Sequence, residues 1–77
     1  MNIILTMEFV EVASSQIRKI GYSEKDRVLA VEFKNNRALY YYKDVSKVIY
    51  EKLINAKSVG KYFEIFIRDE YEYEKMN

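Results

Sequence analysis

Four residue types are missing from this 77-residue chain, which has no cysteine, histidine, proline or tryptophan. Without cysteine there is no disulfide and no thiolate ligand for a zinc ion. Histidine and cysteine also supply many of the general bases and nucleophiles that work near neutral pH. The chain has only two glycines, so it lacks a glycine-rich phosphate loop. We therefore expect a protein that is not an enzyme, with no catalytic residues, no metal site and no cofactor.

Long hydrophobic runs are absent too. No stretch approaches the roughly 20 apolar residues that a membrane-spanning helix needs. The run Ile3-Ile4-Leu5 is too short for the core of a signal peptide, and no basic residue precedes it. These features predict one domain, a cytoplasmic location and no membrane partner.

Aromatic residues are abundant: the chain has eight tyrosines and four phenylalanines. A chain of this length buries only about 60–65% of its unfolded surface, so large aromatic side chains help to fill a small core. The net charge of +1 argues against a protein that binds nucleic acids strongly without distinguishing their base sequence. The charge is uneven, however, with eight basic and four acidic residues in 12–50 and five basic and six acidic in 51–77.

The middle of the chain has the two-residue period of β-strands. Leu29, Val31 and Phe33 alternate with other residues, and the alternation resumes at Tyr40 and Tyr42. Asn35-Asn36 between the two runs tolerates the positive φ of a tight turn. With a strand over residues 16–22, the strands over 27–33 and 37–43 form a three-stranded antiparallel meander.

After residue 43 the period becomes that of a helix. Apolar residues three and four apart predict an amphipathic helix over 46–56, capped by Asp44 or Ser46, and a second helix that begins after Ser58. The predicted fold is α+β, with the order β-β-β-α-α and both helices on one face of the sheet. Gly60 in the first turn of the second helix suggests that another group, the first helix or a ligand, packs close to it. The two faces of the sheet should hold Leu29, Val31, Phe33, Tyr40 and Tyr42 under the helices, and Leu39, Tyr41 and Lys43 on the other side.

The ends of the chain are harder to assign. Residues 1–11 are either an N-terminal extension or an additional edge strand, and 12–71 form the domain. Residues 72–77 are an acidic C-terminal tail. The tyrosine-rich segment over 69–77 either frays or returns along the sheet.

One ordered set of residues extends over most of the chain. Its members are Val12, Ser14-Ser15, Ile17, Ile20-Gly21-Tyr22, Leu29, Val31, Phe33, Tyr40-x-Tyr42-x-x-Val45, Ala56-x-Ser58-x-Gly60-x-Tyr62-Phe63, Ile67-Arg68 and Tyr71. This set resembles the KTSC domain, which is named for the C-terminus of certain lysyl-tRNA synthetases and also occurs as small stand-alone proteins. One departure is Ser46, where the family often has proline. The resemblance implies RNA binding, which is the usual suggestion for this family, and it does not imply synthetase activity.

The first functional hypothesis is a module that binds RNA or another nucleic acid. Single-stranded RNA is held by bases stacked on aromatic rings, with Arg or Lys on the phosphates. On this hypothesis Tyr41 is exposed on the open face of the sheet, while Tyr40 and Tyr42 belong to the core. The predicted nucleic-acid-binding residues are Arg18, Lys19, Tyr22, Arg37, Tyr41 and Lys43.

Three alternatives remain open. A nucleotide-binding, sequestering protein would use a candidate anion site made of Ser15, Ser58, Lys61 and Arg68. A protein-binding inhibitor of a host or defence factor, of the kind phages encode, would present its acidic, tyrosine-rich segment over 69–74 to a partner. A homodimer would form through an uncovered sheet face or a free strand edge.

Overall fold

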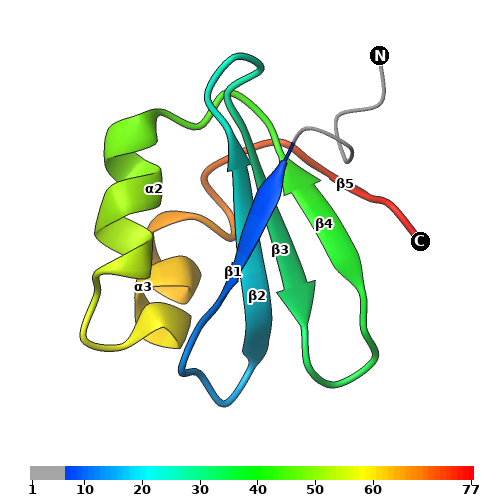
Figure 1. The fold of residues 1–77 in the computed structure, drawn as a ribbon, viewed down its shortest axis with the longest axis vertical. Coiled ribbons are helices and arrows are strands. Elements are labelled where there is room, and N and C mark those ends of the chain that lie inside the picture. The colour runs from blue at the N-terminus through cyan, green and yellow to red at the C-terminus, as the bar shows by residue number, and fades with distance from the viewer. Residues whose placement is uncertain (1–6) are drawn as a thin grey trace.

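The fold is known from a computed structural model, which describes residues 7–77 (Figure 1). One antiparallel sheet of five strands carries two helices on one of its faces. Among residues 7–77, neither helix has the length and apolar character that crossing a bilayer requires. In chain order the elements are β1 Glu8–Glu11, β2 Ile17–Ser23, β3 Val28–Phe33, β4 Leu39–Tyr42, α2 Lys47–Ile54, α3 Val59–Phe66 and β5 Tyr73–Lys75.

The strand order in the sheet is the order in the chain, β1-β2-β3-β4-β5. The predicted central meander, the two helices and the α+β class are confirmed. β1 adds an edge strand beside β2, with Val10 opposite Ile20, as one of the two readings of the N-terminus predicted. The remainder of that predicted segment, residues 1–6, lies outside the described residues.

The C-terminal segment returns along the sheet instead of fraying. β5 pairs with β4, placing Tyr73 opposite Tyr42 and Glu74 opposite Tyr41. The part expected as an acidic tail, residues 72–77, therefore contains a strand. The order of elements is β-β-β-β-α-α-β: the additional N-terminal strand was one of the predicted alternatives, and β5 extends the predicted order at the C-terminal end.

The connection between β3 and β4 is longer than predicted, because β4 begins at Leu39. Arg37, which was expected inside that strand, lies in the turn with a left-handed φ of 59°. The side-chain Oδ1 of Asn36 accepts a hydrogen bond of 3.0 Å from the backbone N–H of Ala38. This local bond shapes the turn, as expected for an asparagine in such a connection.

The main core lies between the sheet and the helices. Each helix starts at a serine cap: the Oγ of Ser46 accepts from the N–H of Ile49, and that of Ser58 from the N–H of Lys61. The predicted covered face is confirmed, although Phe33 and Tyr40 are only partly buried at its margin. The buried residues of this core are Ile17, Ile20, Leu29, Val31, Tyr42, Val45, Leu53, Val59, Phe63 and Ile67.

The opposite face of the sheet has a second, smaller core, which contains Tyr41. The prediction that the Tyr41 ring is open to a ligand is wrong, because only 7% of this residue is exposed. Met7, before β1, and Phe9, on β1, pack over this face. Met7 lies close because Gly21 beneath it has no side chain, and a Cβ there would be 2.8 Å from the Met7 Sδ.

Candidate functional site

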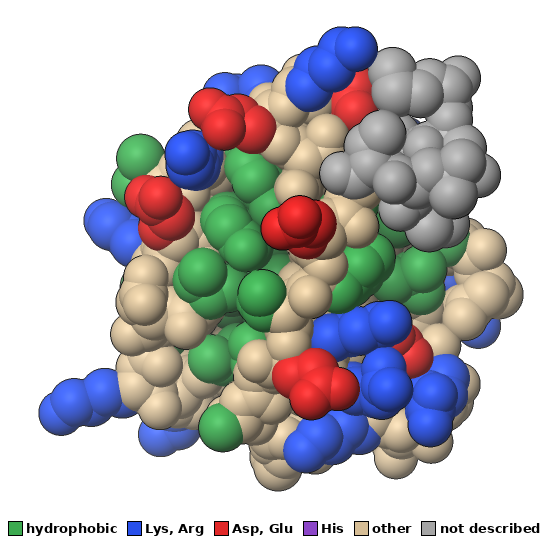
Figure 2. All heavy atoms as spheres, viewed as in Figure 1, with side chains coloured by type: hydrophobic (Ala, Val, Ile, Leu, Met, Phe, Trp, Pro, Cys, Tyr) green, Lys and Arg blue, Asp and Glu red, His purple; other side chains and the backbone are tan. Residues whose placement is uncertain are grey.

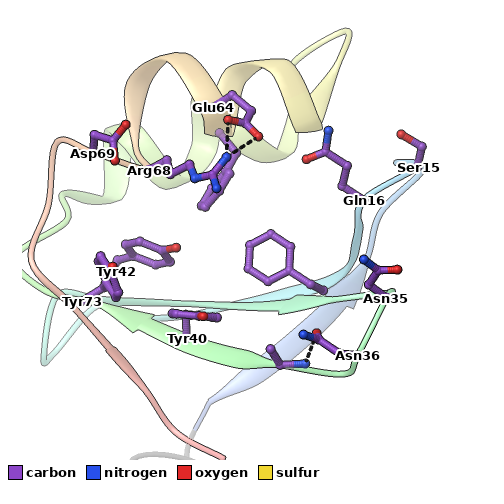
Figure 3. Close-up of a pocket in the computed structure, with 13 residues that line it drawn as sticks. Ser15, Gln16, Asn35, Asn36, Tyr40, Tyr42, Glu64, Arg68, Asp69 and Tyr73 are labelled. Atoms are coloured by element: carbon purple, nitrogen blue, oxygen red, sulfur yellow. Dashed lines mark hydrogen bonds and ion pairs between the residues drawn. The ribbon is translucent and has the colours of Figure 1, made fainter.

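A pocket of about 470 Å³ opens at the edge of the main core, between the sheet and the C-terminal end of α3 (Figure 3). It lies on the same face of the sheet as the helices, beyond the part that they cover. Four segments far apart in the chain form it: the β1–β2 loop, the β3–β4 hairpin, α3 with the residues that follow it, and β5. The pocket is therefore a product of the tertiary fold.

The sheet side of the pocket is aromatic. The Tyr40 ring contacts Phe33 edge-on, with 5.8 Å between ring centroids, and Tyr73 at 5.5 Å. Tyr42 stacks beside Tyr40 at 6.3 Å and lies 5.6 Å from Tyr73. Because each ring contacts its neighbours, this aromatic wall is held in place before any ligand arrives.

The helix side of the pocket is charged. The Nη1 of Arg68 donates hydrogen bonds to both carboxylate oxygens of Glu64, at 2.9 and 2.8 Å. These bonds raise the pKa of Arg68 above its ordinary value, so the side chain is a permanent cation. Asp69 lines the pocket next to this ion pair. Figure 3 shows the pair across the open space from Tyr40 and Tyr42.

The third side of the pocket is neutral and polar. Ser15, Gln16, Asn35 and Asn36 line it, from the β1–β2 loop and the β3–β4 turn. Within residues 7–77 the side-chain amides of Gln16 and Asn35 make no hydrogen bond, so both keep a donor and an acceptor for a ligand. A flat ring with a polar edge fits this combination of aromatic wall and amide groups.

Burial is the main cause of the shifted tyrosine pKa values. It raises the pKa of Tyr42 far above its usual value, and the neighbouring Tyr40 and Tyr73 add to the shift. Burial also raises the pKa of Tyr41. Tyr42 therefore lines the pocket as a neutral hydroxyl. In the part of the chain that the structure describes, no group of three or more acidic side chains is placed to hold a metal ion.

The two aromatic residues proposed from the sequence to stack on bases are not available for that contact. Tyr22 lies on the helix side, where its ring stacks on Tyr50 with 4.8 Å between centroids and its hydroxyl donates to the Val45 carbonyl at 2.6 Å. Tyr41 is buried on the opposite face, and its hydroxyl has no hydrogen-bond partner among the described residues. Both rings are engaged in packing.

The predicted basic residues lie away from the pocket, with the exception of Arg37. Arg18 and Lys19 both contact Glu32, at 3.3 and 3.5 Å, on the face opposite the helices. Lys43 lies 3.9 Å from Glu74. Figure 2 shows a cluster of basic side chains with acidic ones among them at one end of the molecule. Arg37 is exposed in the β3–β4 turn, between two residues that line the pocket.

The candidate anion site is only partly assembled. Ser15 and Arg68 both line the pocket, from opposite sides. Ser58 and Lys61 do not line it, and the Ser58 hydroxyl caps α3. Sequence reasoning missed Gln16, Asn35 and Tyr73 as site residues. The feature of the sequence that could have indicated this site is the density of aromatic residues near Tyr40.

The chain is a small α+β module: a five-stranded antiparallel sheet with two helices inserted before its last strand, and an aromatic pocket at the edge of the core between the sheet and α3. The chain belongs to the KTSC domain family, whose family model matches residues 13–71. This confirms the resemblance found in the sequence.

Relatives and a solved structure agree with this assignment. An uncharacterized protein of Stutzerimonas stutzeri is 33% identical over 72 residues, which are 92% of this chain and 100% of that protein. A lysine–tRNA ligase of Nostoc punctiforme is 27% identical over 74 residues, which are 96% of this chain but only 13% of the ligase. The crystal structure of a KTSC domain protein from Yersinia pestis has a TM-score of 0.88 at 28% identity, covering 92% of this chain and 99% of that one.

Proposed function

We propose that this domain is a binding module, without catalytic activity, that binds RNA or another single-stranded nucleic acid by holding one unstacked base in the aromatic pocket. The observation that carries the proposal is the wall formed by Phe33, Tyr40 and Tyr73, which is accessible from the pocket and already ordered. Stacking of bases on aromatic side chains is the main means by which proteins recognise single-stranded RNA. The pocket replaces the buried Tyr41 as the place where a base would stack.

The β3–β4 turn beside the pocket supplies positive charge for the phosphates. Lys34 and Arg37 are both exposed there, and within residues 7–77 neither forms an ion pair. Phosphates next to a base in the pocket would therefore meet cations at its rim. With a net charge of +1 on the whole chain, we expect few phosphate contacts and a weak dependence of affinity on salt.

The first prediction is that Tyr40→Ala weakens binding of short fluorescein-labelled single-stranded RNA about 10-fold, measured by fluorescence anisotropy, because stacking contributes ~1–3 kcal/mol per base. The matched control is Tyr62→Ala, which removes a tyrosine outside the pocket whose ring packs at a tilt against Phe66, with 4.7 Å between ring centroids. Circular dichroism checks that both variants are folded. Equal losses in the two variants would contradict the role of the pocket.

A further variant tests the opposite face of the sheet. Lys19→Ala removes a cation that lies there, over the Phe9 ring at 4.9 Å and near Glu32. If RNA is bound at the pocket, this change leaves the affinity nearly unchanged. A loss of RNA affinity as large as that caused by Tyr40→Ala would show that RNA binds on the opposite face of the sheet.

A second candidate function, capture of a free nucleotide, is favoured by the size of the pocket. Its volume of about 470 Å³ lies within the range of small-molecule sites, which is roughly 300–1,000 Å³. A thermal-shift panel of mono-, di- and cyclic nucleotides tests this candidate. Stabilisation by one free nucleotide, with no binding of RNA, would favour it over the first.

A further inference from the structure

We infer that the pocket selects a purine base and leaves the phosphate outside. The purine ring would lie between the tyrosines of the aromatic wall, Tyr40 and Tyr42, and the Arg68–Glu64 ion pair. This inference rests on the proposed function and specifies the ligand of the same site. Figure 3 shows the two sides facing each other. Glu64 lies on α3 and Arg68 just after it, and both side chains face Tyr40 and Tyr42 of β4 across the pocket. A guanidinium group is planar and stacks on flat rings, and Glu64 fixes its position with two hydrogen bonds.

Charge determines which part of a nucleotide enters. Among residues 7–77, Arg68 is the only basic residue that lines this pocket, and its charge is matched by Glu64. With Asp69 included, the lining has two carboxylates and one guanidinium, which is one net negative charge. A phosphate that entered would break the Arg68–Glu64 ion pair and would be repelled by the Asp69 carboxylate. An uncharged base does neither.

The shape of the aromatic wall determines which base fits. The Tyr40 and Tyr42 rings lie 27° from parallel with centroids 6.3 Å apart, while the Tyr73 ring is turned 61° and 44° from them and borders this pair. The paired faces of Tyr40 and Tyr42 extend beyond one six-membered ring, so a bicyclic purine covers more of them than a pyrimidine does. Larger stacked area gives stronger binding, because burial of apolar surface and offset stacking both increase with it.

The amide side of the pocket provides contacts for the edge of the base. The carboxamides of Gln16 and Asn35 each present a donor beside an acceptor, and Figure 3 shows them on the side of the pocket away from Arg68. A carboxamide pairs through two hydrogen bonds with an edge that has the complementary pair, as adenine does. These groups therefore orient a base that the tyrosine wall holds.

The test measures the affinity of single-stranded oligouridine in which the central base is uracil, cytosine, adenine or guanine, for the wild type and Tyr40→Ala. We expect a central purine to strengthen binding about 10-fold over a pyrimidine, and Tyr40→Ala to abolish this difference. Equal affinities for all four strands, each weakened by Tyr40→Ala, would overturn the purine inference and leave the proposed function standing. A purine preference that persists in Tyr40→Ala would also overturn it.

The second arm of the test measures, by calorimetry, the affinity of the protein for adenosine, uridine and adenosine 5′-monophosphate. We expect adenosine to bind about 10-fold more tightly than uridine. Any gain of the monophosphate over adenosine should come from Lys34 and Arg37 outside the pocket lining, and the double variant Lys34→Ala, Arg37→Ala should remove it. In Glu64→Gln, Arg68 loses its counter-ion, so the monophosphate should gain affinity over adenosine. Glu70→Gln, at an exposed carboxylate outside the pocket lining, is the control.

The second arm also separates the two proposals. If the wild type binds no RNA but binds adenosine in preference to uridine, the proposed function fails and the ligand inference holds. If the monophosphate binds a Lys34→Ala, Arg37→Ala double variant more tightly than adenosine does, phosphate enters the pocket and the inference is wrong. If neither RNA nor nucleosides bind, both proposals fail.

Discussion

The two glycines of the chain lie in very different surroundings. Gly21, in β2, lies under Met7 and Phe9, where a Cβ would be 2.8 Å from the Met7 Sδ and 3.1 Å from the Phe9 ring. Gly60, in the first turn of α3, has the Ser14 Oγ 3.4 Å from the position of a Cβ, which is an ordinary contact. The neighbour of Gly60 is therefore the Ser14–Gln16 loop, where the sequence suggested the first helix or a ligand, and this loop leaves room for a methyl group.

These surroundings predict opposite effects for the same substitution. Gly21→Ala should lower the free energy of unfolding by about 1–2 kcal/mol, because overpacking forces Met7 or Phe9 to move. Gly60→Ala should raise it by up to about 1 kcal/mol, because alanine favours the helix. Urea denaturation followed by circular dichroism measures both. A Gly21→Ala protein as stable as the wild type would show that Met7 moves aside at no cost.

At the scale of elements, β5 both completes the sheet and forms part of the pocket. Its backbone is tied to β4 by bonds from the Lys43 N–H to the Glu72 carbonyl and from the Met76 N–H to the Leu39 carbonyl, each 2.8 Å. The side chain of Asn77 adds bonds to the backbone of Leu39 and Arg37. The three residues of β5 are otherwise exposed, so hydrogen bonds and the Tyr73 ring hold this strand in place.

Removal of residues 72–77 should therefore affect both stability and binding. We expect the free energy of unfolding to fall by about 1–3 kcal/mol, since hydrogen bonds contribute roughly 0.5–1.5 kcal/mol each, and RNA affinity to fall with it. Tyr73→Ala, which keeps the backbone bonds, should retain most of the stability and still lose affinity. Denaturation and fluorescence anisotropy measure the two effects. A truncated protein that binds RNA as well as the full chain would exclude β5 from the site.

At the scale of the whole molecule, the absence of histidine determines how stability depends on pH. With no histidine in the chain, few groups titrate between about pH 6 and pH 8, so stability should be nearly flat there. Tyrosines respond at higher pH. Burial raises the pKa of Tyr42 above its ordinary value of 10.0, and that of Tyr41 is raised by the same cause.

The sign of the alkaline effect follows from proton binding. Above pH 10 the folded protein keeps protons on these tyrosines that the unfolded chain has lost, so the free energy of unfolding falls as the pH rises. Denaturant titrations from pH 8 upward should show this decline, and Tyr42→Phe should make it shallower. An unchanged slope in Tyr42→Phe would show that other groups cause it.

The central architecture could be predicted from the sequence because it depends on neighbouring residues. Alternation around Leu29 and Tyr42 identified the paired strands and the face that each side chain occupies, and the change of period after Lys43 identified the helices. Ser46 and Ser58 marked the helix starts, because a cap acts within three residues of chain. The family resemblance followed from the same ordered residues.

The burial of Tyr41 and the existence of the pocket were decided only by the tertiary structure. Tyr41 is buried in a cluster with Met7, Val28 and Ala30. Tyr40 lines a pocket that is completed by Arg68 and Tyr73 from near the other end of the chain. β1 and β5 are short, and their pairing depends on the free edges of β2 and β4. Local periodicity indicates which way a side chain points, but what it meets there depends on residues distant in the sequence.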